Sequence, residues 1–189
     1  MTELERKALL PAGLRDVLPP FATFEADVIE RLMSRFEASG YARIKAPLVE
    51  FEEGLLSGPG AAMTADTFRL MDPVSQRMMG VRADITPQIA RIASTRLETA
   101  PRPLRLGYSG EVLRVRGTQL RPERQFAQVG AELIGAESAA ADAETIVLAV
   151  DALGAIGVTD LTVDLTIPPL VPALLDAAAI DIGLRAELR

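Results

Sequence analysis

The stretch GEVLRVRGTQLRPERQFAQVGAE, residues 110–132, decides the fold of this chain. Apolar residues alternate near its two ends and an arginine-rich run lies between them, which predicts a strand, a basic loop and a second strand. Gln128, Gly130 and Glu132 share one face of the second strand with Phe126. Because a buried sheet face seldom carries an amide and a carboxylate, this pattern indicates a small ligand with an ammonium group above it, and Gly130 leaves room for its approach.

Three helices are expected around this strand pair. Apolar residues recur at helical spacing over 21–39, and Gly40 is the expected stop. A second helix begins at Thr86, which caps it ahead of Pro87, and runs to about residue 99. Ser138 caps a third helix that ends near residues 154–157, and short helical pieces finish the chain.

The remaining segments predict strands that cluster along the chain. Pro47 interrupts the first of them, Asp72-Pro73 forms a hairpin turn, and 54–65 is a loop. Clustered strands favour an α+β fold, an antiparallel sheet flanked by helices, with residues 1–189 forming one domain. The expected strands span 41–50, 67–71, 77–82, 104–114, 124–134 and 161–166.

Composition excludes several classes of chemistry. The 189 residues include no Cys and no His, so thiolate zinc sites and Ser-His-Asp, Cys-His or HExxH catalysis are excluded within this chain. The net charge of -6 argues against non-specific binding of nucleic acid. No secretory or membrane-spanning apolar run is found, and we expect a cytoplasmic protein without metal, cofactor, nucleic-acid or membrane partner.

Polar residues at three places suit an α-amino acid. Asp84 and Glu132 suit its ammonium, Arg114 its carboxylate, and Gln128 its orientation, while the Thr86 hydroxyl adds a contact. For Asp84 and Thr86, ordinary helix capping explains the pattern equally well. The loop between the strands is a candidate anion-binding loop, because bidentate guanidinium groups suit carboxylate and phosphate. Its candidate residues are Arg116, Arg121 and Arg124.

The chain resembles the catalytic core of histidyl-tRNA synthetase. The resemblance rests on Pro11–Asp16, on the helix, Gly and Tyr that lead to Pro47, on Arg82–Thr86 and on 110–132. It implies a class II synthetase-like antiparallel sheet. Two stretches carry the family's motifs: 21–47 resembles motif 1, the dimerisation element, and 104–132 resembles motif 2.

Departures from the synthetase pattern lie on the ATP side of the site. Arg116 stands where motif 2 has an acidic residue, and Arg121-Pro122 stands where the synthetase has Gly-Arg. Asp84 replaces a glutamate. No motif 3 occurs before Arg189, so the chain is expected to be an N-terminal portion or a shortened form.

This pattern is similar to the regulatory-subunit family of ATP phosphoribosyltransferase. The resemblance implies a non-catalytic subunit that activates a short-form catalytic subunit and takes part in histidine feedback in the first step of histidine biosynthesis. It also implies a homodimer through 21–47. Two alternatives remain: an active histidyl-tRNA synthetase or related amino-acid-activating enzyme, and a dimerisation module without ligand. The implied histidine-binding residues are Asp84, Thr86, Arg114, Gln128 and Glu132.

Overall fold

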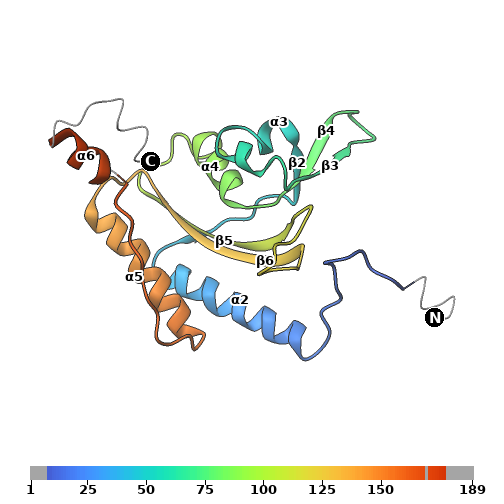
Figure 1. The fold of residues 1–189 in the computed structure, drawn as a ribbon, viewed down its shortest axis with the longest axis horizontal. Helices are drawn as coiled ribbons and strands as arrows, with labels where there is room; N and C mark the ends of the chain where they lie inside the picture. Colours follow the sequence, from blue (N-terminus) through green and yellow to red (C-terminus); the bar gives the residue numbers. More distant parts are fainter. Residues whose placement is uncertain (1–7, 169, 178–189) are drawn as a thin grey trace. The chain divides into compact units, whose positions relative to one another are not determined.

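The computed structural model describes residues 8–168 and 170–177 (Figure 1). The chain divides into two compact units, Met1–Thr159 and Asp160–Arg189. All the strands and helices that surround the candidate site lie in the first unit. These are α2 (Phe21–Ala38), β1 (Ala42–Arg43), β2 (Val49–Phe51), α3 (Glu52–Leu55), the 3₁₀ helix η1 (Gly58–Met63), β3 (Phe68–Met71), β4 (Met78–Val81), α4 (Thr86–Ser94), β5 (Leu104–Leu113), β6 (Gln125–Ile134) and α5 (Ala139–Ala155).

The strands form two three-stranded sheets. In the first sheet β5 lies between β1 and β6, with β1 parallel and β6 antiparallel to it. In the second, β4 lies between β2 and β3, and both pairings are antiparallel. The expected α+β fold with mainly antiparallel pairing is therefore confirmed, although the strands divide between two sheets. Gly107 pairs with Ala131, and Tyr108 pairs with Gly130.

Helices cover both faces of the β5–β6 pair. Figure 1 shows α2 and α5 on one face, and α4 with the second sheet on the other. Met33, Phe36 and Tyr41 form a core with α5 on the first face. Because side chains alternate across a strand, the second face carries a separate core. Its buried members are Ile85, Ile89, Leu106, Tyr108 and Val112.

Helix boundaries follow the local sequence at two of the three expected helices. Gly40 has a φ of +84°, which favours glycine, and it ends α2. The Ser138 hydroxyl accepts a hydrogen bond from the backbone N–H of Ala141 at the start of α5. Both predictions are confirmed. None of the helices within the described residues has the length and apolar content needed to cross a membrane.

Three local predictions were wrong. Thr86 does not cap α4; the Asp84 carboxylate accepts from the Thr86 N–H instead, and the helix ends at Ser94 rather than near residue 99. The expected loop 54–65 contains η1 and the end of α3. Residues 161–166 have no strand partner among the described residues, so their alternating pattern forms no strand. One expected helical piece is present in the second unit as α6 (Leu170–Ala177), and the rest fall outside the described residues.

Candidate functional site

The turn before α4 is joined to β6 through a single amide. The Nε2 of Gln128 donates to the Asp84 Oδ1 at 3.0 Å, and its Oε1 accepts from the Ile85 N–H at 2.9 Å. The same Asp84 oxygen accepts from the Thr86 N–H at 2.8 Å. The structure thus brings together two of the candidate residues that lie 44 positions apart in the sequence. Gln128 has both of its polar groups engaged, so its orientation is fixed by the fold.

A second chain of hydrogen bonds links α4 to the end of β6. The Thr86 hydroxyl lies 2.9 Å from the Tyr108 hydroxyl, which donates to the Glu132 Oε1 at 3.2 Å. Since Tyr108 has one proton to donate, the Thr86 hydroxyl is the donor in the first of these bonds. Thr86 and Glu132 therefore face the same space from opposite elements.

The two carboxylates in this space lack cationic partners. Within the described residues, neither Asp84 nor Glu132 forms an ion pair with an arginine or lysine. Burial raises the pKa of Glu132 above its usual value, the hydrogen bond from Tyr108 opposes the rise, and the nearby Asp84 charge adds to it. Burial also raises the pKa of Tyr108 to about 12. An added cation would relieve this desolvated negative charge.

Arg114 anchors the opposite end of the site. Its Nε donates to the Ala83 carbonyl at 3.4 Å, next to Asp84, and its guanidinium lies 5.2 Å from the centre of the Phe126 ring. The ring, Gln128 and Glu132 follow one another along the same face of β6. Arg114 therefore lies beside the Phe126 end of this face, Glu132 lies at its other end, and Gln128 between them binds Asp84.

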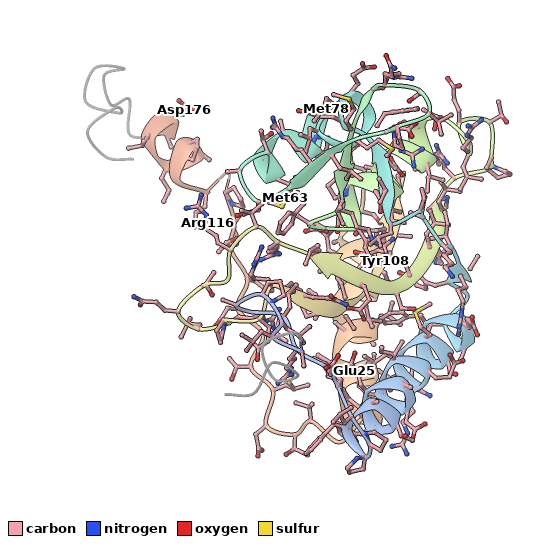
Figure 2. All side chains as sticks on the ribbon, turned by 90° about the vertical axis from the view of Figure 1, so that its right-hand side faces the viewer. Glu25, Met63, Met78, Tyr108, Arg116 and Asp176 are labelled. Carbon is pink, nitrogen blue, oxygen red and sulfur yellow. The ribbon has the colours of Figure 1, made fainter. Side chains whose placement is uncertain are left out.

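The three arginines of the candidate anion-binding loop have different surroundings. Arg121 lies over Phe126, with 4.7 Å between the guanidinium carbon and the ring centre. Arg124 is structural: it donates to the carbonyls of Arg114 and Ala12 and so holds the N-terminal turn against the loop. Arg116 is exposed on the loop between β5 and β6 (Figure 2), and it makes no side-chain hydrogen bond or ion pair within the described part of the chain. The loop therefore leaves Arg116 and Arg121 for an anion.

A cavity of about 290 Å³ adjoins the carboxylate end of the site. Thr86 and Glu132 form one side of it, and the small side chains of Ala90 and Ala93 keep it open. Arg102 closes its far end, where the guanidinium is occupied by the carbonyls of α4 and the following turn. The cavity is large enough for a five-membered ring, and its polar lining residues are Thr86, Ser94, Arg102 and Glu132.

Tyr108 belongs to the site although sequence reasoning did not include it. A Cβ at Gly130 would lie 2.4 Å from the Tyr108 hydroxyl, so the room at Gly130 is taken by this phenol and not by a ligand. The prediction that Gly130 admits a ligand was wrong. The strand register places Tyr108 opposite Gly130, and this pairing could have indicated that Tyr108 belongs to the site. Arg82 similarly fills the space above Gly110 and donates to the Glu111 and Ala46 carbonyls.

Comparison with known families decides where the chain belongs. The family model for histidyl-tRNA synthetase matches residues 13–189. The chain belongs to the histidyl-tRNA synthetase family. The resemblance inferred from the strand pair and the Arg82–Thr86 turn is confirmed.

Two curated relatives and two solved structures can be compared with the chain directly. The chain is 65% identical over 88% of its length to the ATP phosphoribosyltransferase regulatory subunit of Rhodospirillum centenum, and 62% identical over 97% to that of Rhodospirillum rubrum. A histidine–tRNA ligase subunit from Alicyclobacillus acidocaldarius matches 95% of the chain and 51% of its own length, with a TM-score of 0.74 and 33% identity. A protein from Bacillus halodurans, described as an ATP phosphoribosyltransferase regulatory subunit/histidyl-tRNA synthetase, matches 81% of the chain and 39% of its own length, with a TM-score of 0.70 and 32% identity.

The chain spans about half the length of the curated relatives that it matches, with 43% of the first Rhodospirillum protein and 48% of the second covered. The class II synthetase-like fold is shared with these structures.

Proposed function

We propose that this chain forms part of a regulatory subunit of ATP phosphoribosyltransferase, which binds histidine and activates a short-form catalytic subunit. The observation that carries this proposal is the 65% identity to a relative named as that regulatory subunit. The proposal includes the role in histidine feedback, in the first step of histidine biosynthesis, that the resemblance to the regulatory-subunit family implies.

We propose one orientation for histidine in the site. Its ammonium lies between Asp84 and Glu132, which have no cationic partner among the described residues. Its carboxylate points along β6 toward Arg114, and its side chain enters the 290 Å³ cavity beside Thr86. Gln128 holds the Asp84 carboxylate in place. The ligand thereby supplies the positive charge that the two half-buried carboxylates lack.

A non-catalytic role is supported by the basic loop. Arg116 stands where the synthetase motif has an acidic residue, and Arg121 lies over the Phe126 ring. Arg116 replaces a hydrogen-bond acceptor that a nucleotide base would need, and the Arg121 guanidinium covers one face of the Phe126 ring. We infer that the chain takes up an amino acid without activating it.

Self-association through 21–47 is part of the proposal. Phe21 and Phe24 are about two-thirds exposed on α2, where they line a groove of about 410 Å³ with Leu18 and Val28. Exposed aromatic side chains of this size on one helix face favour a partner helix. A second copy of the chain is the partner we propose for them.

Activity of the catalytic subunit tests the regulatory role. The short-form catalytic subunit is assayed with and without the intact regulatory protein, and each arm is run with and without histidine. We expect activation that histidine reverses. A catalytic subunit that responds to neither addition refutes the proposal.

Two further assays separate the alternatives. Histidine-dependent exchange between ATP and pyrophosphate would identify an amino-acid-activating enzyme. A dimerisation module without ligand would show no rise in thermal unfolding temperature with histidine, because a ligand that binds the native state must stabilise it. We expect no exchange and a clear thermal stabilisation.

A further inference from the structure

A second hollow lies on the opposite side of α4 from the amino-acid site. It is a groove of about 580 Å³ between β2, α3 and α4. Thr86, Ala90 and Ala93 of α4 face the amino-acid cavity, whereas Arg91 and Ile92 face the groove. At 3.6 residues per turn these two sets of residues lie on different faces of the helix. The groove is therefore separate from the proposed histidine site.

The lining of the groove combines an apolar floor with positive charge. Val49, Phe51, Met79 and Ile92 provide the apolar surface. Arg91 and Arg96 contribute two guanidinium groups, and Glu50 contributes one carboxylate, which forms an ion pair with Arg91. Arg96 is exposed and has no ion pair or side-chain hydrogen bond within the part of the chain that the structure describes. The lining thus carries one more positive charge than negative charge.

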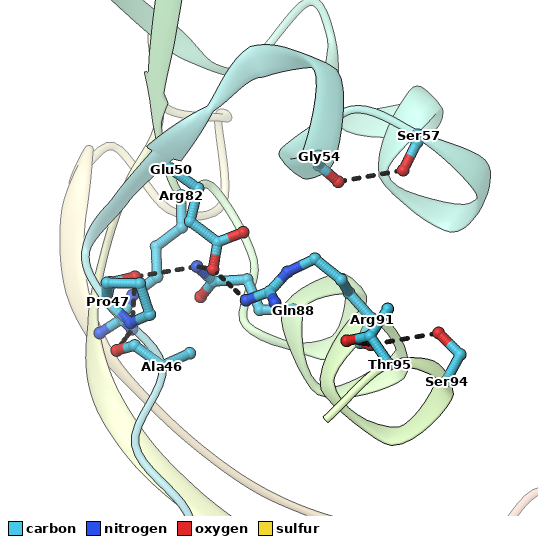
Figure 3. A network of polar contacts seen from close by, with 10 residues as sticks. All are labelled: Ala46, Pro47, Glu50, Gly54, Ser57, Arg82, Gln88, Arg91, Ser94 and Thr95. Carbon is cyan, nitrogen blue, oxygen red and sulfur yellow. Dashed lines mark hydrogen bonds and ion pairs between the residues drawn. The ribbon is translucent and has the colours of Figure 1, made fainter. Parts of the chain in front are cut away.

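Two buried polar atoms beside the groove lack hydrogen-bond partners within the described residues. They are the Nε of Arg91 and the Oε1 of Gln88, whose side chain is 1% exposed. Figure 3 shows the hydrogen bonds that the neighbouring atoms form. The Gln88 Nε2 donates to the Pro47 carbonyl and to the Glu50 Oε1, and the Arg91 Nη2 donates to the same Glu50 oxygen. None of these bonds uses the Gln88 Oε1 or the Arg91 Nε. Buried groups without partners are uncommon in native proteins, and a bound water or ion is one way in which their bonding is completed.

We propose that this groove is a second ligand site, which takes a small anion with an apolar body. The anion accepts from the Arg96 guanidinium and from the exposed part of the Arg91 guanidinium, since guanidinium groups suit carboxylate, sulfonate and phosphate oxygens. The apolar body lies on Phe51, Met79 and Ile92. This inference stands on the groove alone and does not depend on the proposed function.

The glutamate at the groove competes with the ligand. Glu50 is 10% exposed in its side chain, and it occupies one end of the Arg91 guanidinium. Removing its charge frees Arg91 for an incoming anion, whereas reversing the charge of Arg96 repels the anion. The two substitutions are therefore expected to change ligand affinity in opposite directions.

Dye binding tests the site in the intact protein. The probe is anilinonaphthalene sulfonate, an aromatic anion, and the control is phenylnaphthylamine, the same skeleton without the sulfonate. We expect Arg96→Glu to raise the Kd of the anionic dye at least about tenfold and Glu50→Gln to lower it. The matched control is Arg31→Glu, which makes the same charge change at an exposed arginine of α2 that lines neither the groove nor the amino-acid cavity, and it should change the Kd by less than about twofold.

Four results would overturn the proposal. Arg96→Glu could leave the Kd unchanged or change it no more than Arg31→Glu does, or the uncharged dye could lose as much affinity as the anionic one. Displacement of the dye by saturating histidine would place it in the amino-acid site instead. Because Arg96 is exposed, its substitution leaves the fold intact, and thermal unfolding of each variant confirms this.

Discussion

Glu132 offers the sharpest test of the amino-acid site, since one substitution is expected to weaken binding and strengthen the fold. Glu132→Gln keeps the size of the side chain and removes its charge. A hydrogen bond to a charged group contributes about 1.5–3 kcal/mol, so the Kd for histidine should rise by roughly 10- to 150-fold. Titration calorimetry of the intact protein measures this change.

The same substitution should stabilise the ligand-free protein at neutral pH. Burial raises the folded-state pKa of Glu132 above that of an unfolded glutamate. The folded state therefore favours the protonated carboxyl, and its stability falls as the pH rises through these two pKa values. The amide that replaces the carboxyl does not titrate, so the Glu132→Gln variant should resist urea better than the wild type at neutral pH. This advantage should vanish below about pH 4, where glutamate is protonated in both states.

A matched control separates the site from a general loss of charge. Glu98 is exposed and has no ion pair among the described residues, so Glu98→Gln should leave the Kd within about twofold of its wild-type value. An unchanged histidine affinity in Glu132→Gln would refute the proposed site. Lower stability of this variant at neutral pH would refute the reasoning about burial.

Three further predictions concern the fold and the proposed interface between copies of the chain. Gly130→Ala brings a Cβ to 2.4 Å from Tyr108 and should cost about 1–3 kcal/mol of unfolding free energy, whereas Gly154→Ala, with open space around it, should not destabilise the protein in the same urea titration. Ser138→Ala removes the side-chain cap of α5 and should cost about 1 kcal/mol, measured in the same way. Phe24→Asp places a charge on the exposed face of α2 and should yield a monomer in light scattering; a dimer of unchanged mass would contradict the proposed interface.

Local chemistry made the main elements predictable. Gly40 and Ser138 specify their helix ends through backbone conformation and a capping hydroxyl, and the structure has both. The strands around 110–132 follow from alternation, because their two faces meet different cores. The polar face carrying Gln128 was predicted correctly as a place where distant residues meet.

Features that depend on distant partners could not be predicted from the sequence. Residues 161–166 alternate like a strand, yet a strand needs a neighbour, and the described residues provide none. Asp84 took the role expected of Thr86 because a carboxylate two residues before the N–H reaches it directly. Tyr108 entered the site only through the strand register, which sets it opposite Gly130.

Tyr108 and Gly130 occupy a single shared volume, and this has a consequence for variation within the family. The phenol fits only while position 130 has no side chain, since a Cβ there would overlap the ring. A relative that carries a larger residue at position 130 must therefore carry a smaller one at position 108. Such a protein would lose the hydroxyl that joins Thr86 to Glu132. A larger residue at position 130 is thus expected only together with a smaller residue at position 108.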